Sequence, residues 1–146
     1  MSSVPAEPLL RLYNLQEQVS LDVDYIRQGA ERAIPRCVKQ AVSDSPLVGL
    51  EHLEVSVVSG SRLSEVHERF LDDSTATDVI TFDYGEIIVS ADMAQEKASG
   101  LGHSTEVELL LYVIHGLLHL GGFNDKSDME FEEMSAIQER IWKDSR

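Results

Sequence analysis

The chain has a single cysteine, no long hydrophobic run and few basic residues. Cys37 is the only cysteine among 146 residues, so an internal disulfide is impossible and a reducing compartment is expected. The longest apolar run, residues 109–114, ends at His115 and falls far short of the ~20 residues that span a bilayer. The N-terminus lacks the basic segment followed by an apolar stretch that marks a signal peptide. We therefore expect a cytoplasmic protein with no membrane partner.

Basic residues are scarce. There are 12 lysines and arginines against 26 aspartates and glutamates, which gives a net charge of −14 at pH 7. Binding to nucleic acid relies on lysine and arginine displacing counterions from phosphates, so this balance disfavours an RNA or DNA partner. Local charge matters more than the sum, however, so the composition does not exclude a nucleic-acid substrate.

The strongest chemical signal is in residues 109–125, LLLYVIHGLLHLGGFND. His115 and His119 are four residues apart in an apolar run, so on a helix their rings lie on one face. The two glycines that follow are typical of a helix end, and Asp125 comes just after them, where a chain reversal would return it to the histidines. Two imidazoles and one later carboxylate would form a three-ligand metal site with an open position.

The histidine pair also has a plainer interpretation. An H-x3-H spacing arises by chance, and two histidines beside a core, each hydrogen-bonded to backbone, are the main alternative to a metal site. The more usual zinc-hydrolase helix reads H-E-x-x-H, with the glutamate as general base. Gly116 occupies that position here, which argues against a metalloprotease. No catalytic base is assigned from the sequence.

Hydrophobic periodicity predicts a single α+β domain at residues 9–146 that follows a loose tail at 1–8. The predicted strands are 9–15, placed at a sheet edge, 51–58, and the hairpin 79–82 with 86–90. Three predicted helices span 21–42, 61–71 and 92–99, and two more begin at capping boxes, Thr105 to Glu108 and Ser127 to Glu130. The histidine helix is apolar nearly all round, so we expect it at the centre of the domain.

Local signals predict where several of these helices begin, bend and end. Ser20 is the predicted N-cap of the first helix, and Pro35 predicts a kink or break near residues 31–35. Gly100 and Gly102 are expected to close the short helix before the histidine helix. The final helix is expected to bury a stripe made of Phe131, Met134, Ile137 or Gln138, and Ile141.

HGLLHLGGFND resembles the H-G-x-L-H-L-x-G-Y-D-H signature of the YbeY family, bacterial endoribonucleases that mature ribosomal RNA. Four other blocks look like that family's successive segments in the right order: TDVITF (77–82), GEIIVSADMA (85–94), GHSTEVELLLYVIHG (102–116) and SDMEFEEMSAIQERI (127–141). The resemblance implies a metzincin-like α+β fold, with a small mixed four-stranded sheet, about five helices and a central histidine helix. It also implies one zinc ion per chain, with His115 and His119 matching the first two ligands and Asp125 at the third position.

The function implied is a metal-dependent, single-strand-specific endoribonuclease that acts in 16S ribosomal RNA 3′-end maturation and ribosome biogenesis. The partners implied are ribosomal RNA and the small ribosomal subunit, with a ribosome-assembly GTPase or a ribosomal protein as a further partner, and no DNA. The alternative is a non-catalytic or weakly catalytic ribosome-assembly factor whose metal site is structural.

That alternative rests on departures from the family pattern. Asp125 stands where the family has a histidine, and an anionic ligand leaves the metal site at a charge of about +1 instead of +2, so a bound water is acidified less. The family's usual Tyr-Arg is Phe70-Leu71 here, and that arginine is thought to meet the substrate phosphate. The usual proline before T-[DN]-V is Ala76.

The candidate substrate-binding residues are basic. Arg69 lies two residues before the position of the family's arginine, and Arg32, Arg36 and Lys39 follow one another at i, i+4 and i+7, which places them in one stripe of a helix. A solvated helix face is the alternative explanation of the stripe.

Other polar and sulfur-containing residues have plain structural explanations. His103 is expected to act structurally at the start of the histidine helix, and Met134 and Cys37 are expected in the core. Glu86 and Asp92 flank a strand beside the expected site, where a solvated strand end explains them equally well.

Overall fold

The structure, a computed structural model of the chain, describes residues 6–71 and 78–146, apart from the side chain of Leu71. Residues 1–5 of the predicted tail and Ala76 lie outside the described residues, whereas Pro8 is described and buried. The elements are β1 (Leu9–Asn14), α1 (Val23–Gln40), β2 (His52–Val58), α2 (Gly60–Leu71), β3 (Val79–Phe82), β4 (Glu86–Ser90), α3 (Ala91–Leu101), α4 (Thr105–Leu120) and α5 (Asp128–Ser145).

The strands form one mixed sheet in the order β1-β2-β4-β3. β1 pairs with β2 and β2 with β4 in parallel, while β3 pairs with β4 antiparallel through the predicted hairpin. Gly85 in the hairpin turn has φ of +108°, and a Cβ there would lie 2.7 Å from the carbonyl oxygen of His52, so glycine is required. The predicted α+β class, mixed four-stranded sheet and set of helices are confirmed for the described part of the chain.

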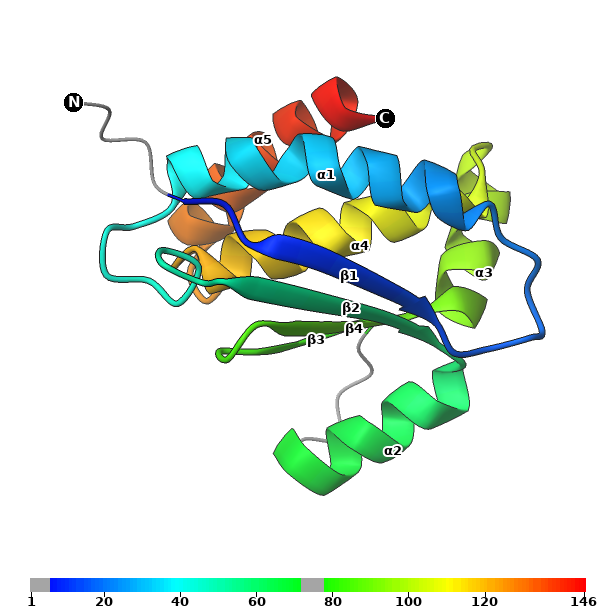
Figure 1. Ribbon diagram of the computed structural model, residues 1–146. Coiled ribbons are helices and arrows are strands. Elements are labelled where there is room, and N and C mark those ends of the chain that lie inside the picture. Colours follow the sequence, from blue (N-terminus) through cyan, green and yellow to red (C-terminus); the bar gives the residue numbers. More distant parts are fainter. Residues whose placement is uncertain (1–5, 72–77) are drawn as a thin grey trace.

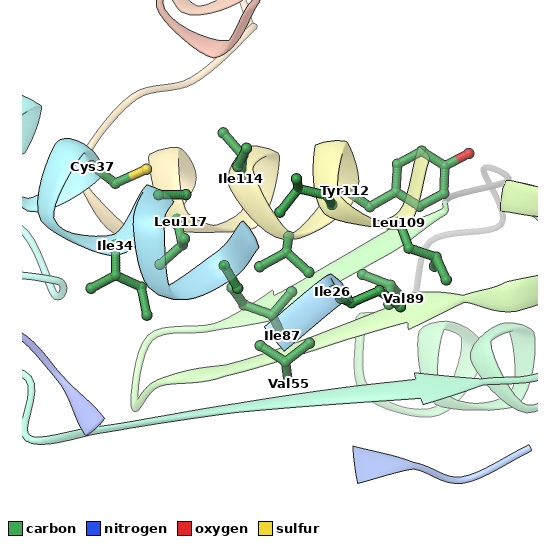
Figure 2. Close-up of a cluster of buried hydrophobic side chains, with 14 of the residues drawn as sticks. Ile26, Ile34, Cys37, Val55, Ile87, Val89, Leu109, Tyr112, Ile114 and Leu117 are labelled. Carbon is green, nitrogen blue, oxygen red and sulfur yellow. The ribbon is translucent and has the colours of Figure 1, made fainter. Parts of the chain in front are cut away.

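Helices cover the two faces of the sheet unequally (Figure 1). α1, α4 and α5 lie on one side and α2 lies on the other. The main core lies between α1, α4 and the sheet, where side chains such as Ile26, Ile87 and Leu117 converge (Figure 2). A smaller apolar cluster lies under α2 and includes Val66 and Ile88. The histidine helix α4 is therefore the central helix of the larger layer, as its composition predicts.

Helix α1 differs from its prediction in two respects. The N-cap is Asp22, whose Oδ1 accepts a hydrogen bond from the backbone N–H of Tyr25 at 3.2 Å, and not Ser20. The helix continues past Pro35 without a break. Buried residues on both sides of the proline, among them Ala30 and Val38, pack into the main core, and this packing outweighs the loss of one backbone hydrogen bond.

The capping prediction for α4 is wrong by one residue. Ser104 caps the helix by accepting from the N–H of Val107 at 3.1 Å. Glu108 turns instead toward His103, where its Oε1 lies 2.7 Å from Nε2. The second predicted box is confirmed, because Ser127 accepts from the N–H of Glu130 at 3.2 Å and also donates to its carboxylate at 2.8 Å.

Two further predictions need correction. α3 is longer than predicted and contains Gly100, so Gly102 alone caps it in the left-handed conformation. On α5, Met134 and Ile141 are buried in the main core as predicted, but Phe131 is 56% exposed and is not part of that core.

Gly116 allows α4 to pack closely against β4. A Cβ at this position would lie 2.9 Å from Cγ2 of Ile87. We expect Gly116→Ala to destabilise the protein by about 1–3 kcal/mol through overpacking, measured as the free energy of unfolding in urea. Gly100→Ala is the matched control: it faces open space within α3 and should be neutral or stabilising by up to about 1 kcal/mol. Equal effects of the two changes would contradict this account.

Candidate metal centre

Helix α4 leaves one stripe uncovered. From Leu109 to Leu120 every residue is buried except Leu111, His115 and His119, which follow one another at intervals of four. This spacing places the three side chains in line along one face of the helix. The two histidines are thus half-buried on the single open face of an otherwise enclosed helix.

The end of α4 folds back on itself. Gly122 has φ of +96°, its N–H donates to the carbonyl oxygen of His119 at 3.1 Å, and the N–H of Phe123 donates to that of Leu118 at 3.0 Å. These two bonds form a Schellman motif, which the left-handed conformation of Gly122 makes possible. The reversal brings the residues after the helix, including Asp125, back beside the histidines.

The structure brings the three predicted ligands together. One nitrogen of His115, one of His119 and a carboxylate oxygen of Asp125 all lie within 4.8 Å of one another. The two Nε2 atoms are 3.0 Å apart. Two imidazoles on a tetrahedral zinc ion, with bonds of 2.0–2.1 Å, have nitrogens about 3.3 Å apart, so the pair is already close to a chelating geometry.

Hydrogen bonds orient both rings. Nδ1 of His119 lies 3.0 Å from the carbonyl oxygen of Phe123, and Nδ1 of His115 lies 2.7 Å from Oε1 of Gln138 on α5. Both oxygens accept, so each Nδ1 carries the proton and each Nε2 presents a lone pair. Two lone pairs that face each other at 3.0 Å repel unless a cation lies between them, so this donor set fits a metal ion.

The protonation of His119 also suits a ligand. Burial lowers the pKa of His119, because an imidazolium loses solvation, and the nearby His115 lowers it further. The charge of Asp125 and the hydrogen bond to Phe123 act in the opposite direction. The net lowering favours the neutral ring, which is the form that binds metals.

Sequence reasoning missed Gln138 as part of this site. The only signal was that either Ile137 or Gln138 fitted the predicted apolar stripe of α5. A glutamine in a buried stripe needs a polar partner, and the sequence did not say which. That partner is His115, which lies 23 residues earlier in the chain, so only the packing of α5 on α4 reveals the contact.

The other end of α4 holds a polar pair with a structural role. Glu108 is 3% exposed and is hydrogen-bonded to His103. The centres of the His103 and Trp142 rings are 5.5 Å apart. Trp142 in turn donates from Nε1 to the carbonyl oxygen of Val107 at 2.9 Å. These contacts anchor α5 to the start of α4, which agrees with the structural role expected for His103.

The candidate substrate-binding residues lie on two separate helices, α1 and α2. Arg32, Arg36 and Lys39 form an exposed stripe on α1, as predicted, but Arg32 donates from Nε to the carbonyl oxygen of Ser145 at 2.8 Å and so ties down the end of α5. Arg69 lies on α2, which covers the sheet face opposite α4 (Figure 1), and its guanidinium is 5.7 Å from the centre of the Phe70 ring.

Two acidic residues near β4 have local partners. Oδ2 of Asp92 accepts from the N–H of Gly60 at 3.0 Å, which caps the start of α2. Glu86 accepts from the hydroxyl of Tyr84, and this hydrogen bond raises the pKa of Tyr84 to about 12. Both carboxylates therefore have defined hydrogen-bond partners, whereas the sequence analysis explained them equally well by exposure to solvent at a strand end.

No helix in the described ranges is both long and apolar enough to cross a bilayer.

Comparison with known proteins identifies the family. The model of the Endoribonuclease YbeY family matches residues 11–146. The Endoribonuclease YbeY of Thermotoga maritima is 36% identical over 110 residues, which are 68% of this chain and 73% of that protein. The Beutenbergia cavernae protein of the same name is 32% identical over 126 residues, 75% and 82% of the two chains. The Micrococcus luteus protein of that name is 34% identical over 103 residues, which are 60% of this chain and 66% of that protein.

A solved structure agrees with the fold. The solution structure of TM1509 from Thermotoga maritima superimposes with a TM-score of 0.59 at 28% identity, covering 93% of this chain and 91% of that one. The match therefore extends over nearly the whole chain. On the family model, the relatives and the shared fold, this chain belongs to the YbeY family of endoribonucleases.

Proposed function

We propose that this protein is a metal-dependent endoribonuclease that cuts single-stranded RNA, with one zinc ion held by His115, His119 and Asp125. The observation that supports this most directly is the convergence of two Nε2 lone pairs and a carboxylate on the open stripe of α4. Family membership supplies the reaction class, because the relatives are named endoribonucleases. By the same resemblance, the substrate would be the 3′ end of 16S ribosomal RNA, on or near the small ribosomal subunit in the cytoplasm.

The chain's own residues would prepare the site in three ways. Phe123 and Gln138 hold both histidines in the tautomer that points Nε2 toward the ligand position. Asp125 contributes a negative charge, which lowers the net charge of a divalent site to about +1 and favours harder metals than a third histidine would. A bound metal ion would supply Lewis acidity toward a phosphate oxygen and would lower the pKa of a coordinated water.

A second candidate is a ribosome-assembly factor that binds metal for stability only. The net charge of −14 favours it, and so does Leu71 at the position where the resemblance to the family implies an arginine. The two candidates share the metal site and differ in whether RNA is cut, so cleavage separates them.

The first prediction concerns His119. His119→Ala removes one of the two converging nitrogens, so purified protein should fall from about one bound metal ion per chain to near zero and should lose RNA cleavage. Elemental analysis and cleavage of a labelled single-stranded RNA measure the two effects. His52→Ala, an exposed histidine on β2, is the control and should keep both properties. Cleavage that survives in His119→Ala would refute the proposed enzyme, whereas metal without cleavage in the unmodified protein would favour the assembly factor.

The second prediction concerns Gln138. Gln138→Leu leaves Nδ1 of His115 without an acceptor, so metal affinity measured by chelator competition should fall about 10- to 100-fold. Gln138→Glu keeps an oxygen acceptor at the same place and should retain tight binding. If Gln138→Leu bound metal as tightly as the unmodified protein, the hydrogen bond to His115 would have no role in the site.

The third prediction concerns Leu71 in the last turn of α2. If bound RNA also reaches α2, on the sheet face opposite α4, and the site lacks a group that binds its phosphate, Leu71→Arg should raise kcat/KM for RNA about tenfold or more, because a charge-assisted hydrogen bond is added. Leu71→Gln, which adds polarity without charge, is the matched control. No gain from Leu71→Arg over Leu71→Gln would mean that this position does not limit catalysis.

A further inference from the structure

Three aromatic side chains, Phe70 on α2, the half-buried Phe82 on β3 and Tyr84 in the hairpin turn, form one ladder. The rings of Phe82 and Tyr84 stack at 5.5 Å with an interplanar angle of 18°, and Phe70 meets Phe82 edge-on at 6.3 Å. Phe70 is 63% exposed and Tyr84 is 68% exposed, although neither takes part in the main core. Large apolar side chains left together on a surface mark an interaction site more often than isolated ones do.

Beside this ladder is an acidic part of the sheet. Glu54 on β2 and Glu86 on β4 are register partners, Glu86 is also the partner of Phe82, and all three point to the α2 face of the sheet. Glu54 and Glu86 are half-buried, and within the described ranges neither lies within 4 Å of a basic group. Like charges directly across a sheet destabilise it, so a cation bound between them would be favourable.

The ladder already holds one cation. The guanidinium of Arg69 lies over the ring of Phe70 at 5.7 Å, at the end of the ladder away from Tyr84. Arg11, exposed on β1, is the register partner of Glu54 at the outer end of the acidic row. The rings of Phe82 and Tyr84, next to Glu86, therefore offer a cation–π site with a carboxylate at its edge that no described basic side chain occupies.

We propose that Phe70, Phe82 and Tyr84, together with Glu54 and Glu86, form a docking surface for an arginine- or lysine-rich segment of a protein partner. Cationic side chains would stack on the exposed rings and pair with the two carboxylates. Single-stranded RNA is the less suitable occupant, because its bases could stack on the rings but its phosphates would approach Glu54, Glu86 and the exposed Asp83.

Phe82, Glu54 and Glu86 lie on the sheet face that α2 covers, whereas the histidine helix α4 covers the other face (Figure 1). If the protein acts on RNA as proposed, its net charge of −14 repels the substrate. A basic partner that is bound at this surface and itself binds RNA would bring substrate and enzyme together. The docking proposal needs only the surface and does not depend on cleavage.

The test is binding of a fluorescent peptide of alternating arginine and glycine, followed by anisotropy at low and physiological salt. Tyr84→Ala should weaken binding about two- to fivefold, and Tyr84→Phe, which keeps the ring, should not. The double change Glu54→Gln with Glu86→Gln should weaken binding and reduce its salt dependence. RNA cleavage should remain at its original level in all three variants, which separates failure of the docking proposal from failure of the proposed enzyme.

Matched controls come from α5. Phe131→Ala removes another exposed ring, and Glu132→Gln with Glu133→Gln removes two other exposed charges, and neither should change peptide affinity. Equal losses in the controls would show attraction by net charge alone and would overturn the proposal. It would also be overturned if Tyr84→Ala weakened binding of single-stranded RNA but not of the peptide, or if it broke up a dimer of this chain.

Discussion

The burial of α4 on all sides but one is the constraint on which the rest of the structure depends. Gly116 lets the helix rest directly on Ile87 of β4, and α1, α3 and α5 enclose most of the remainder. A polar ring on an enclosed helix is stable only where it has a partner or meets solvent. His115 and His119 therefore occupy the one open stripe, where they meet each other and the segment that returns after the helix.

Each part of the metal centre is held by a different piece of the chain. α4 supplies the two rings, the Schellman turn at its end supplies the carbonyl oxygen of Phe123, and α5 supplies Gln138. Further along, α5 is tied to the start of α4 through Trp142 and to α1 through Arg32. The orientation of His115 thus depends on contacts at the far end of α5, because a helix that shifted along its axis would move Gln138 away from the ring.

The metal centre, the exposed stripe of α1 and the α2 face of the sheet differ in charge. The metal centre would be only weakly positive with Asp125 as a ligand, and the basic stripe on α1 is partly used to hold α5. The α2 face of the sheet combines exposed rings with two adjacent carboxylates. An acidic chain that acts on RNA would gain from a basic partner, since electrostatic attraction between partners raises the rate of encounter.

The histidine helix, the hairpin and the order of helices and strands were predictable from the sequence, because each follows from periodicity, glycine conformation or capping within a few residues. The same local reasoning placed the caps of α1 and α4 wrongly and expected a kink or break near Pro35, where the helix has no break, because it ignored the neighbours against which those segments pack. It also expected Phe131 to be buried, although the period of a helix does not say how far the neighbouring layer extends.

The sequence by itself determined which residues could bind a metal: His115 and His119 share a helical face, and Asp125 follows a glycine turn. Only the tertiary structure decided that the three meet within 4.8 Å, that Gln138 sets the tautomer of His115, and that Glu108 pairs with His103 instead of capping the helix. The physical reason is distance along the chain. Helical spacing is a local property, whereas a partner from another element is known only once the layers have packed.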